Sequence, residues 1–300
     1  MLSLAACNVS PPTPTLTPRS VVTPSKTAGP GVPPPNPRPT QATAPSVGSA
    51  LTNTPRPTAT HIPTPTSPPW EILAPGLAVR HIPVLVDGIP ALVYAVRIDP
   101  GRVDFRVHWD SETAHTVEEW QALTGAWLVV NGGFFTGGNA PVGRLIIDGE
   151  MFGSQEIYSD SISVGGLFAV VDGEVTLRAL GRGPYGPNAM RYDQAVECYP
   201  MLLLPGRQPT YPVDTGEQAR RTVIALDEDG HVVILLSDLP VFTLYGLSRW
   251  LARSDLRLDT ALNLDGGRSS GMVVKAPGSP ESVFPAYVPL PIVIAVYPRE

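Results

Sequence analysis

One stretch, ALNLDGGRSSG at 261–271, combines the residue types of a site that acts on a small anion. Its apolar residues predict a short buried strand that ends at Asp265. Gly266 and Gly267 follow, and adjacent glycines let the backbone take positive φ and approach a ligand with bare N–H groups. Hydrogen-bond donors come next: Arg268, Ser269 and Ser270. We expect a carboxylate beside an anion-binding corner, although a tight loop between two strands explains the same pattern.

A second corner of this kind lies upstream. In AWLVVNGGFF, a short apolar run ends at Asn131, which is followed by Gly132 and Gly133. Helices are predicted just before both corners, because 116–123 carries a capping box and 244–253 has leucines at helical spacing. The order helix, buried strand and polar-Gly-Gly corner thus occurs twice, although the independent use of two common turns is an alternative explanation.

Two adjacent arginines, Arg220 and Arg221, precede a buried-looking strand over 223–226. Because side chains alternate along a strand, one of the two is expected to point into the domain, where a guanidinium needs an anionic partner. A guanidinium also donates two parallel hydrogen bonds to a phosphate group. The partner is therefore either a phosphodiester or a carboxylate in a structural salt bridge, for which Asp265 is a candidate.

Short strands and tight turns dominate the chain from residue 70 onward. Candidate strands over 77–86, 91–98 and 103–109 predict an opening meander. The turn signals are Asp87-Gly88, Pro100-Gly101, Asp148-Gly149, Asp172-Gly173 and Asp229-Gly230. With two clear helices, the pattern predicts an α+β fold of mostly antiparallel sheets, with helices packed against them, in one globular domain over 70–300. An all-β sandwich is the alternative, and the helix before each corner argues against it.

The N-terminal part has a different composition. Leu4-Ala5-Ala6-Cys7 has the spacing of a bacterial lipoprotein cleavage site within a truncated signal over 1–7, or is an accidental match near a start. Residues 8–69 are rich in Pro and Thr and lack apolar side chains for a core, which predicts a disordered, extended linker. We therefore expect lipid on Cys7, a stalk and an extracytoplasmic, membrane-anchored location at the cell envelope.

Charge and composition argue against several function classes. The net charge is −6 and no basic stripe is present, so nucleic acid is not expected as a partner. Outside the lipobox the only thiol is Cys198, so a disulfide within the domain is excluded and a buried, unreactive thiol is expected. No histidines have zinc-site spacing, and the serines lack a nucleophile elbow. We expect no required cofactor, while a divalent cation and the oligomeric state stay open.

Three motifs, in order, resemble those of the phosphodiester glycosidase family: NGGFF at 131–135, RRTVIALDEDGHVVILLSD at 220–238 and LNLDGGRSS at 262–270. The resemblance extends from about Val93 to the C-terminus. It implies hydrolysis of the glycosidic C1–O bond of a sugar-1-phosphodiester, as by an α-N-acetylglucosaminidase. The chain departs from the family pattern at Arg268, where a third glycine is usual, and at 288–291, VPLP, which lacks the family's Arg and Asn.

The resemblance and the chemistry together suggest roles for these residues. Asp265 is the first candidate for the carboxylate that attacks C1 or activates water, with a rival role as ligand of a sugar hydroxyl or a metal. Arg221 matches the family's arginine and would neutralise the leaving phosphate. Glu197 and Asp238 are candidates for a second carboxylate. The expected substrate-binding residues are Asn131, Gly132, Gly133, Phe135, Thr222, Gly266, Gly267, Arg268, Ser269 and Ser270.

Two alternatives stay open at this point. Phe134 is the alternative to Phe135 for stacking on a sugar ring, and at least one of the pair is expected to pack in the core. In place of an enzyme, the same corner would also serve a non-catalytic envelope module that binds anionic cell-wall glycans without turnover.

Overall fold

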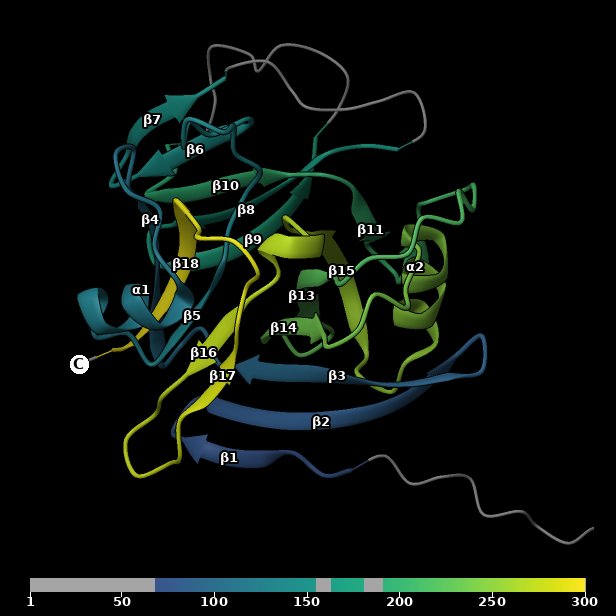
Figure 1. Cartoon of the computed structure of the whole chain (residues 1–300). Helices are drawn as coiled ribbons and strands as arrows, with labels where there is room; N and C mark the ends of the chain where they lie inside the picture. Colours follow the sequence, from purple (N-terminus) through teal and green to yellow (C-terminus); the bar gives the residue numbers. More distant parts are fainter. Residues whose placement is uncertain (1–67, 155–162, 181–190, 300) are drawn as a thin grey trace, which may run out of the picture. The chain divides into compact units, whose positions relative to one another are not determined.

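The computed structural model describes residues 68–154, 163–180 and 191–299. The expected lipobox with Cys7, and the linker as far as residue 67, lie outside the described residues. Of the two units of the chain, Met1–His61 and Ile62–Glu300, the described residues belong to the second. Their strands form three sheets in which every pairing is antiparallel (Figure 1).

The largest sheet has eight strands in the order β1-β2-β3-β14-β13-β15-β11-β12. Asp87 and Gly88 form the predicted turn between β2 and β3, and both have the positive φ that a type I′ turn requires. The predicted opening meander is wrong in its third strand, β4 (Val103–Trp109), which pairs with β18 (Ile292–Pro298) in another sheet. The strands of the largest sheet are β1 (Glu71–Ala74), β2 (Leu77–Val86), β3 (Ile89–Ile98), β14 (Val232–Ser237), β13 (Thr222–Asp227), β15 (Leu258–Asn263), β11 (Met201–Leu204) and β12 (Gln208–Pro209).

Two five-stranded sheets complete the domain. One has the order β7-β6-β10-β8-β9, and positive φ at Asp148 and Asp172 confirms the tight turns predicted for its hairpins. The other has the order β17-β16-β5-β18-β4. Their remaining strands are β7 (Glu150–Gly153), β6 (Arg144–Ile147), β10 (Gln194–Cys198), β8 (Gly166–Val171), β9 (Glu174–Ala179), β17 (Ser282–Phe284), β16 (Met272–Val274) and β5 (Leu128–Asn131).

The main hydrophobic core is shared by all three sheets. Its fully buried members include Ile234 of β14, Val130 of β5 and Phe168 of β8, one from each sheet. A second core lies on the other face of the largest sheet, where Val223 and Leu251 are buried together. Strand β13 is therefore covered on both faces, which explains its continuous apolar run.

Two α-helices precede the two corners, as predicted. Helix α1 (Val117–Thr124) leads into β5, and α2 (Leu244–Arg253) leads into β15. Thr116 and Glu119 form the expected capping box, with the Glu119 carboxylate accepting from the Thr116 N–H at 2.8 Å. Trp120 fastens α1 to the domain, because its indole N–H donates to the Leu290 carbonyl at 2.7 Å.

The prediction of mostly antiparallel sheets is confirmed, but the α+β label understates the strand content. The described residues form many strands and only two α-helices, and tight hairpin turns join several of the strands. Neither of these helices has the length and apolar character required to cross a membrane.

Candidate active site

The two polar-Gly-Gly corners meet in space. Asn131 is the last residue of β5, and Asp265 follows the end of β15. The Asn131 Nδ2 donates to the main-chain carbonyl of Asp265 at 2.7 Å, and the Asp265 N–H donates to the Gly132 carbonyl at 3.2 Å. Each corner therefore forms hydrogen bonds with main-chain groups of the other, and the two similar sequences together build one junction.

Asn131 is committed to this junction. Its side-chain oxygen accepts from the Thr222 hydroxyl at 2.8 Å and from the Gly271 N–H at 3.1 Å, and the residue is 1% exposed. Both acceptor positions of the amide oxygen are thus used inside the protein. The predicted role of Asn131 in contacting a sugar is not tested by these bonds, which show a residue that joins β5, β13 and the turn after β15.

The Asp265 carboxylate is held from two sides. Its Oδ1 accepts from the Gly266 N–H at 2.8 Å, and the Ser269 hydroxyl donates a second bond. Burial raises the pKa of Asp265, and these two hydrogen bonds oppose the rise. The carboxylate is consequently fixed in orientation and only partly shielded from solvent, as an attacking group or general base requires.

Cys198, at the end of β10, brings the third sheet to the corner. Its buried thiol is in hydrogen-bond contact with the backbones of Phe134 and Asp265. Burial raises the pKa of Cys198 strongly, and the nearby Asp265 and Glu197 raise it further. The thiol is therefore protonated and unreactive, as the sequence predicted, but its position beside Asp265 was not foreseen.

The glycines of both corners serve close packing. A Cβ on Gly132 would lie 2.7 Å from the Ile292 side chain, and one on Gly266 would lie 3.1 Å from the Arg220 carbonyl. Gly267 has a φ of +62°, which side chains disfavour. The N–H groups of Gly132, Gly266 and Gly267 are all bonded within the protein, so the predicted loop of bare N–H groups is wrong for these three residues.

Arg221, the predicted phosphate ligand, is directed elsewhere. Its Nε donates to the Phe242 carbonyl at 3.1 Å and its Nη2 donates to the Glu217 carbonyl at 2.9 Å. Burial lowers the pKa of Arg221. Within 68–154, 163–180 and 191–299, no ion pair joins Asp265 to Arg220 or Arg221, so the structural salt bridge considered from sequence is not formed.

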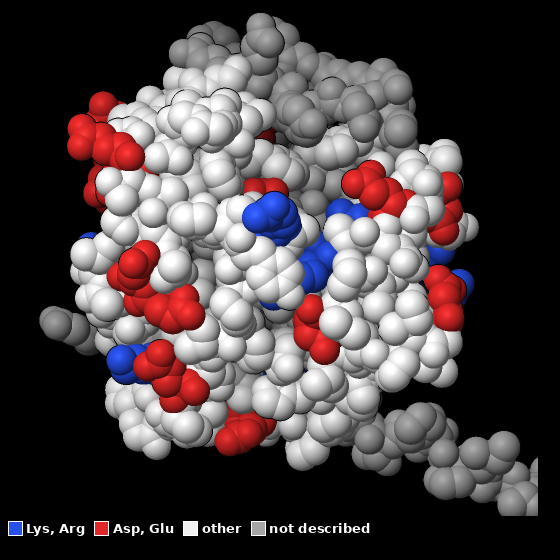
Figure 2. Space-filling model, viewed as in Figure 1, with Lys and Arg blue, Asp and Glu red and all other residues white. Residues whose placement is uncertain are grey.

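Arg220 is the arginine linked to the Asp265 loop. Its carbonyl accepts from the Gly267 N–H at 2.8 Å, and its guanidinium lies 4.5 Å from the centre of the Tyr287 ring. The sequence analysis considered Arg220 but favoured Arg221, and it did not consider Tyr287. The signal for Arg220 was present, because Thr222 is expected to face the domain and alternation then places Arg220 on the same side. On the face of the molecule that Figure 2 shows, basic side chains gather near the centre and acidic side chains are spread around them.

The two candidates for a second carboxylate lie in other networks. Glu197 is buried on β10, and its Oε2 accepts from the Arg144 N–H at 3.2 Å. Alternation along β10 directs Glu197 to the face opposite Cys198. Asp238 follows β14, and its Oδ1 accepts from the Leu92 N–H at 2.9 Å. Glu197 nevertheless lies close to the Asp265 corner, because both carboxylates raise the pKa of the Cys198 thiol.

The remaining predicted ligands are distributed around the loop. Arg268 is exposed, Ser269 bonds Asp265, and the Ser270 hydroxyl is buried without a protein partner in the described part of the chain. Phe135 forms an isolated β-bridge with Pro141, and its side chain packs against two hydrophobic clusters. This is the core role that was expected for at least one of the two phenylalanines.

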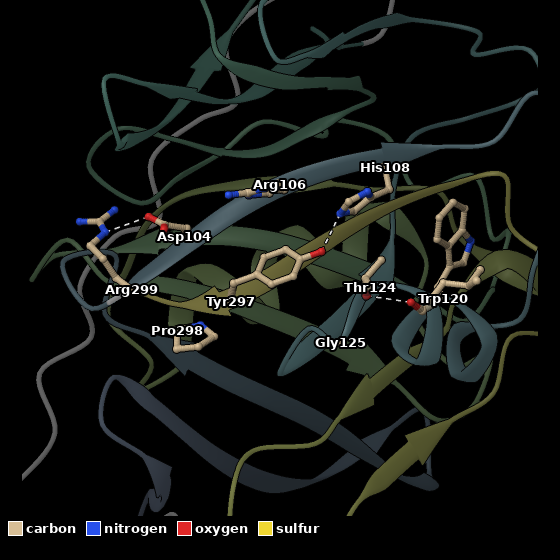
Figure 3. A pocket seen from close by; sticks show the side chains of 10 residues that line it. Asp104, Arg106, His108, Trp120, Thr124, Gly125, Tyr297, Pro298 and Arg299 are labelled. Carbon is tan, nitrogen blue, oxygen red and sulfur yellow. Dashed lines mark hydrogen bonds and ion pairs between the residues drawn. The ribbon is translucent and has the colours of Figure 1, made fainter.

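A separate groove of about 1030 Å³ lies between α1, β4 and β18 (Figure 3). Its polar side chains pair with each other: His108 and the Tyr297 hydroxyl are 2.7 Å apart, and Arg299 bonds Asp104 at 2.8 Å. Tyr297 lies four residues along β18 from Val293, which pairs with the end of β5, so the groove is about 13 Å from the corners along that strand.

One cluster has the donor atoms of a metal site. Asp227, Asp229 and His231, in the turn between β13 and β14, offer ligand atoms within 4.8 Å of one another. This turn is at the opposite end of β13 from Thr222, and Asp229 is paired with Arg257 at 3.0 Å. The cluster therefore does not belong to the Asp265 corner.

Comparison with known proteins gives the family and the fold. No curated protein matches the chain. The catalytic domain of zebrafish N-acetylglucosamine-1-phosphodiester α-N-acetylglucosaminidase, auto-inhibited by its pro-peptide, is similar in structure with a TM-score of 0.56 and 15% identity, over 79% of this chain and 86% of that one. A hypothetical protein from Synechocystis has a TM-score of 0.53 and 15% identity, over 78% of this chain and 64% of that one.

The sequence itself matches a family model. The model of the phosphodiester glycosidase family matches residues 124–296, which is more than half of the chain. The matched region contains Asn131, Thr222 and Asp265, the residues whose side chains or main chains build the junction. The chain therefore belongs to the phosphodiester glycosidase family.

Proposed function

We propose that this domain hydrolyses the glycosidic C1–O bond of a sugar-1-phosphodiester. The observation that carries the proposal is the Asp265 carboxylate, held by the Gly266 N–H and the Ser269 hydroxyl where strand ends of three sheets converge. The zebrafish protein of similar fold, named for its action on an N-acetylglucosamine-1-phosphodiester, supports the substrate class.

The chemistry follows from the charge that develops at each end of the breaking bond. As the C1–O bond breaks, its electron pair goes to the phosphate oxygen and positive charge grows at C1. The Asp265 carboxylate either bonds to C1 itself or takes the proton of the water that does so. A phosphate ester leaves as a stable anion, so its oxygen requires charge neutralisation more than protonation. Two cations are associated with the loop: Arg268 lies within it, and Arg220 accepts from the Gly267 N–H through its carbonyl.

We also propose that the protein acts at the cell envelope, anchored by lipid on Cys7 and held away from the membrane by the linker. The motif at Cys7 and the composition of 8–69 support this location. Membrane fractionation of wild type and Cys7→Ala tests it. The variant is expected in the aqueous fraction, and an unchanged distribution contradicts the anchor.

One observation favours a second candidate, a glycan-binding module without turnover. The N–H groups of Gly132, Gly266 and Gly267 are all bonded within the protein, so these three residues offer no bare N–H groups to stabilise a leaving phosphate. Such a module would bind anionic glycans through the same residues.

Release of free sugar distinguishes the two functions. Wild type, Asp265→Asn and Asp259→Asn are incubated with a synthetic sugar-1-phosphodiester and with a UDP-sugar. Asp259 is the matched control, because it lies near the other end of β15 and its Oδ1 also accepts a main-chain N–H, that of Gly206 at 2.7 Å. Turnover by wild type and Asp259→Asn, with loss in Asp265→Asn, is expected. Glycan binding without turnover in all three supports the module.

A further inference from the structure

A buried cation, Arg220, borders the proposed active site and forms no ion pair with a carboxylate of the described residues. Arg220 is 6% exposed, yet its side chain makes one described hydrogen bond, from Nη1 to the Pro285 carbonyl at 3.1 Å. Its Nε is buried and has no acceptor among the described residues. Burying a guanidinium is unfavourable unless an anion or several acceptors compensate it, so this position is prepared for a negatively charged ligand.

A second arginine is fastened to the same tyrosine. The Tyr287 N–H donates to the Arg268 carbonyl at 2.7 Å, and the Arg268 Nη2 lies 3.5 Å from the Tyr287 carbonyl. Tyr287 also covers the Arg220 guanidinium with its ring, while the residue as a whole remains 62% exposed. One short segment therefore holds two guanidinium groups, and Arg268 too has no ion pair within the described residues.

Both arginines belong to segments that are joined to the Asp265 loop. Arg268 is the central residue of the short 3-10 helix η1 (Gly267–Ser269), whose last residue, Ser269, bonds the Asp265 carboxylate. The first residue of the same helix donates its N–H to the Arg220 carbonyl. A sugar ester with C1 at Asp265 would thus have positive charge available on its leaving-group side.

We infer that Arg220 and Arg268 form an anion site for two neighbouring phosphoryl groups, so that the preferred substrate is a sugar diphosphate ester. The substrate preference rests on the proposed function, whereas the anion-binding site does not. A phosphodiester carries one negative charge, which a single guanidinium balances. A diphosphate diester carries two, one for each arginine, and guanidinium groups bind phosphoryl oxygens in bidentate fashion.

The site is tested first by binding, independently of catalysis. Isothermal titration calorimetry, in buffer that contains a metal chelator, compares the affinities for inorganic pyrophosphate and inorganic phosphate. The proteins are wild type, Arg268→Gln and a control, Arg253→Gln. Arg253 is an exposed arginine in the last turn of α2. Wild type and the control are expected to bind pyrophosphate at least about tenfold more tightly than phosphate, and Arg268→Gln is expected to lose about tenfold in pyrophosphate affinity. Equal affinity for the two ligands in wild type, or an unchanged Arg268→Gln, overturns the inference.

Turnover then separates this inference from the proposed function. The ratio of kcat/KM for a UDP-sugar to that for a sugar-1-phosphodiester is expected to fall about tenfold in Arg268→Gln. Turnover without any effect of Arg268 on this ratio or on pyrophosphate binding overturns the diphosphate preference and leaves the glycosidase standing. Arg268-dependent pyrophosphate binding by a protein inert on both substrates leaves the anion site standing and overturns the glycosidase. Because Arg268 is exposed, the variant is expected to fold.

Discussion

The Asn131 amide donates to the main-chain carbonyl of Asp265 at 2.7 Å, so the residue proposed for catalysis is positioned through its backbone by a side chain from another sheet. This leaves the Asp265 carboxylate to its own partners, Gly266 and Ser269. Position and reactivity are thus controlled by different groups, and substitutions can separate them.

Asn131→Asp tests the positioning bond. The new carboxylate keeps the acceptors for Thr222 and Gly271 but loses the donor to Asp265, and it places a charge at a position that is 1% exposed. We expect the free energy of unfolding to fall by about 3 kcal/mol, measured by urea denaturation, with activity lost. Asn139→Asp, in an exposed turn region, should leave stability nearly unchanged. A stable, active Asn131→Asp protein would contradict the positioning role.

Asp265→Asn should stabilise the protein in a pH-dependent way. Burial raises the pKa of Asp265 in the folded state, so ionisation favours unfolding, and the penalty develops as pH rises from the unfolded pKa of about 3.9 through the folded value. The amide keeps an acceptor for the Gly266 N–H. We expect a higher Tm than wild type at about pH 8 and no difference at about pH 3, by thermal scanning. A gain of the same size at both extremes would rule out this origin.

The Ser269 hydroxyl should set the acid limb of activity. It donates to Asp265 and so lowers the pKa that burial raises. If the carboxylate must be ionised, kcat/KM falls as pH drops through that pKa, and Ser269→Ala should move the limb to higher pH. The neighbouring Ser270→Ala, which removes a hydroxyl without a described partner, should leave the limb where it is in wild type. Identical limbs in all three proteins would remove Asp265 as the titrating group.

Arg221→Ala should affect stability more than chemistry. Its guanidinium connects the Glu217 and Phe242 carbonyls, and its removal leaves both carbonyls without this donor. We expect a loss of about 2 kcal/mol in unfolding free energy and, in the folded fraction, kcat/KM within about threefold of wild type. The same assay on Arg220→Gln should show the reverse pattern. Abolished turnover in a fully stable Arg221→Ala protein would return the phosphate-binding role to Arg221.

His108 should contribute acid sensitivity. Burial, followed by Arg106, lowers the pKa of His108 in the folded state. Stability is therefore lost as pH falls through the unfolded histidine pKa of about 6.5 toward the lower folded value. His108→Gln should show a smaller drop in Tm between about pH 8 and about pH 5 than wild type. The exposed His81→Gln serves as the control, and equal drops in all proteins would refute the prediction.

Local patterns were readable from the sequence, and contacts between distant strands were not. The capping box at Thr116 and the Asp-Gly turns depend on a few neighbouring residues, and the structure confirms them. The sheet to which β4 belongs depends on its pairing with β18, far along the chain, so the predicted meander was wrong there. Strand pairing is decided by tertiary packing rather than by local propensity.

In the candidate site, too, local features were predictable from the sequence and contacts between distant residues were not. The two corners were visible as strand ends followed by glycines, and their meeting is now seen in the bonds between Asn131 and Asp265. The choice between Arg220 and Arg221 depended on which of them shares a face with Thr222, and the bond from Thr222 to Asn131 shows that this face points to the corner. Tyr287 came from a segment with no motif, because stacking on an arginine leaves no periodic signal in sequence.

The convergence of strand ends from three sheets on one corner has a kinetic consequence. Main-chain amides at Gly132, Asp265 and Gly267 are bonded to partners in other segments, so none can be released by fraying of a single hairpin. Deuterium uptake at these positions should be as slow as in the strands of the core and should accelerate only when the whole domain opens.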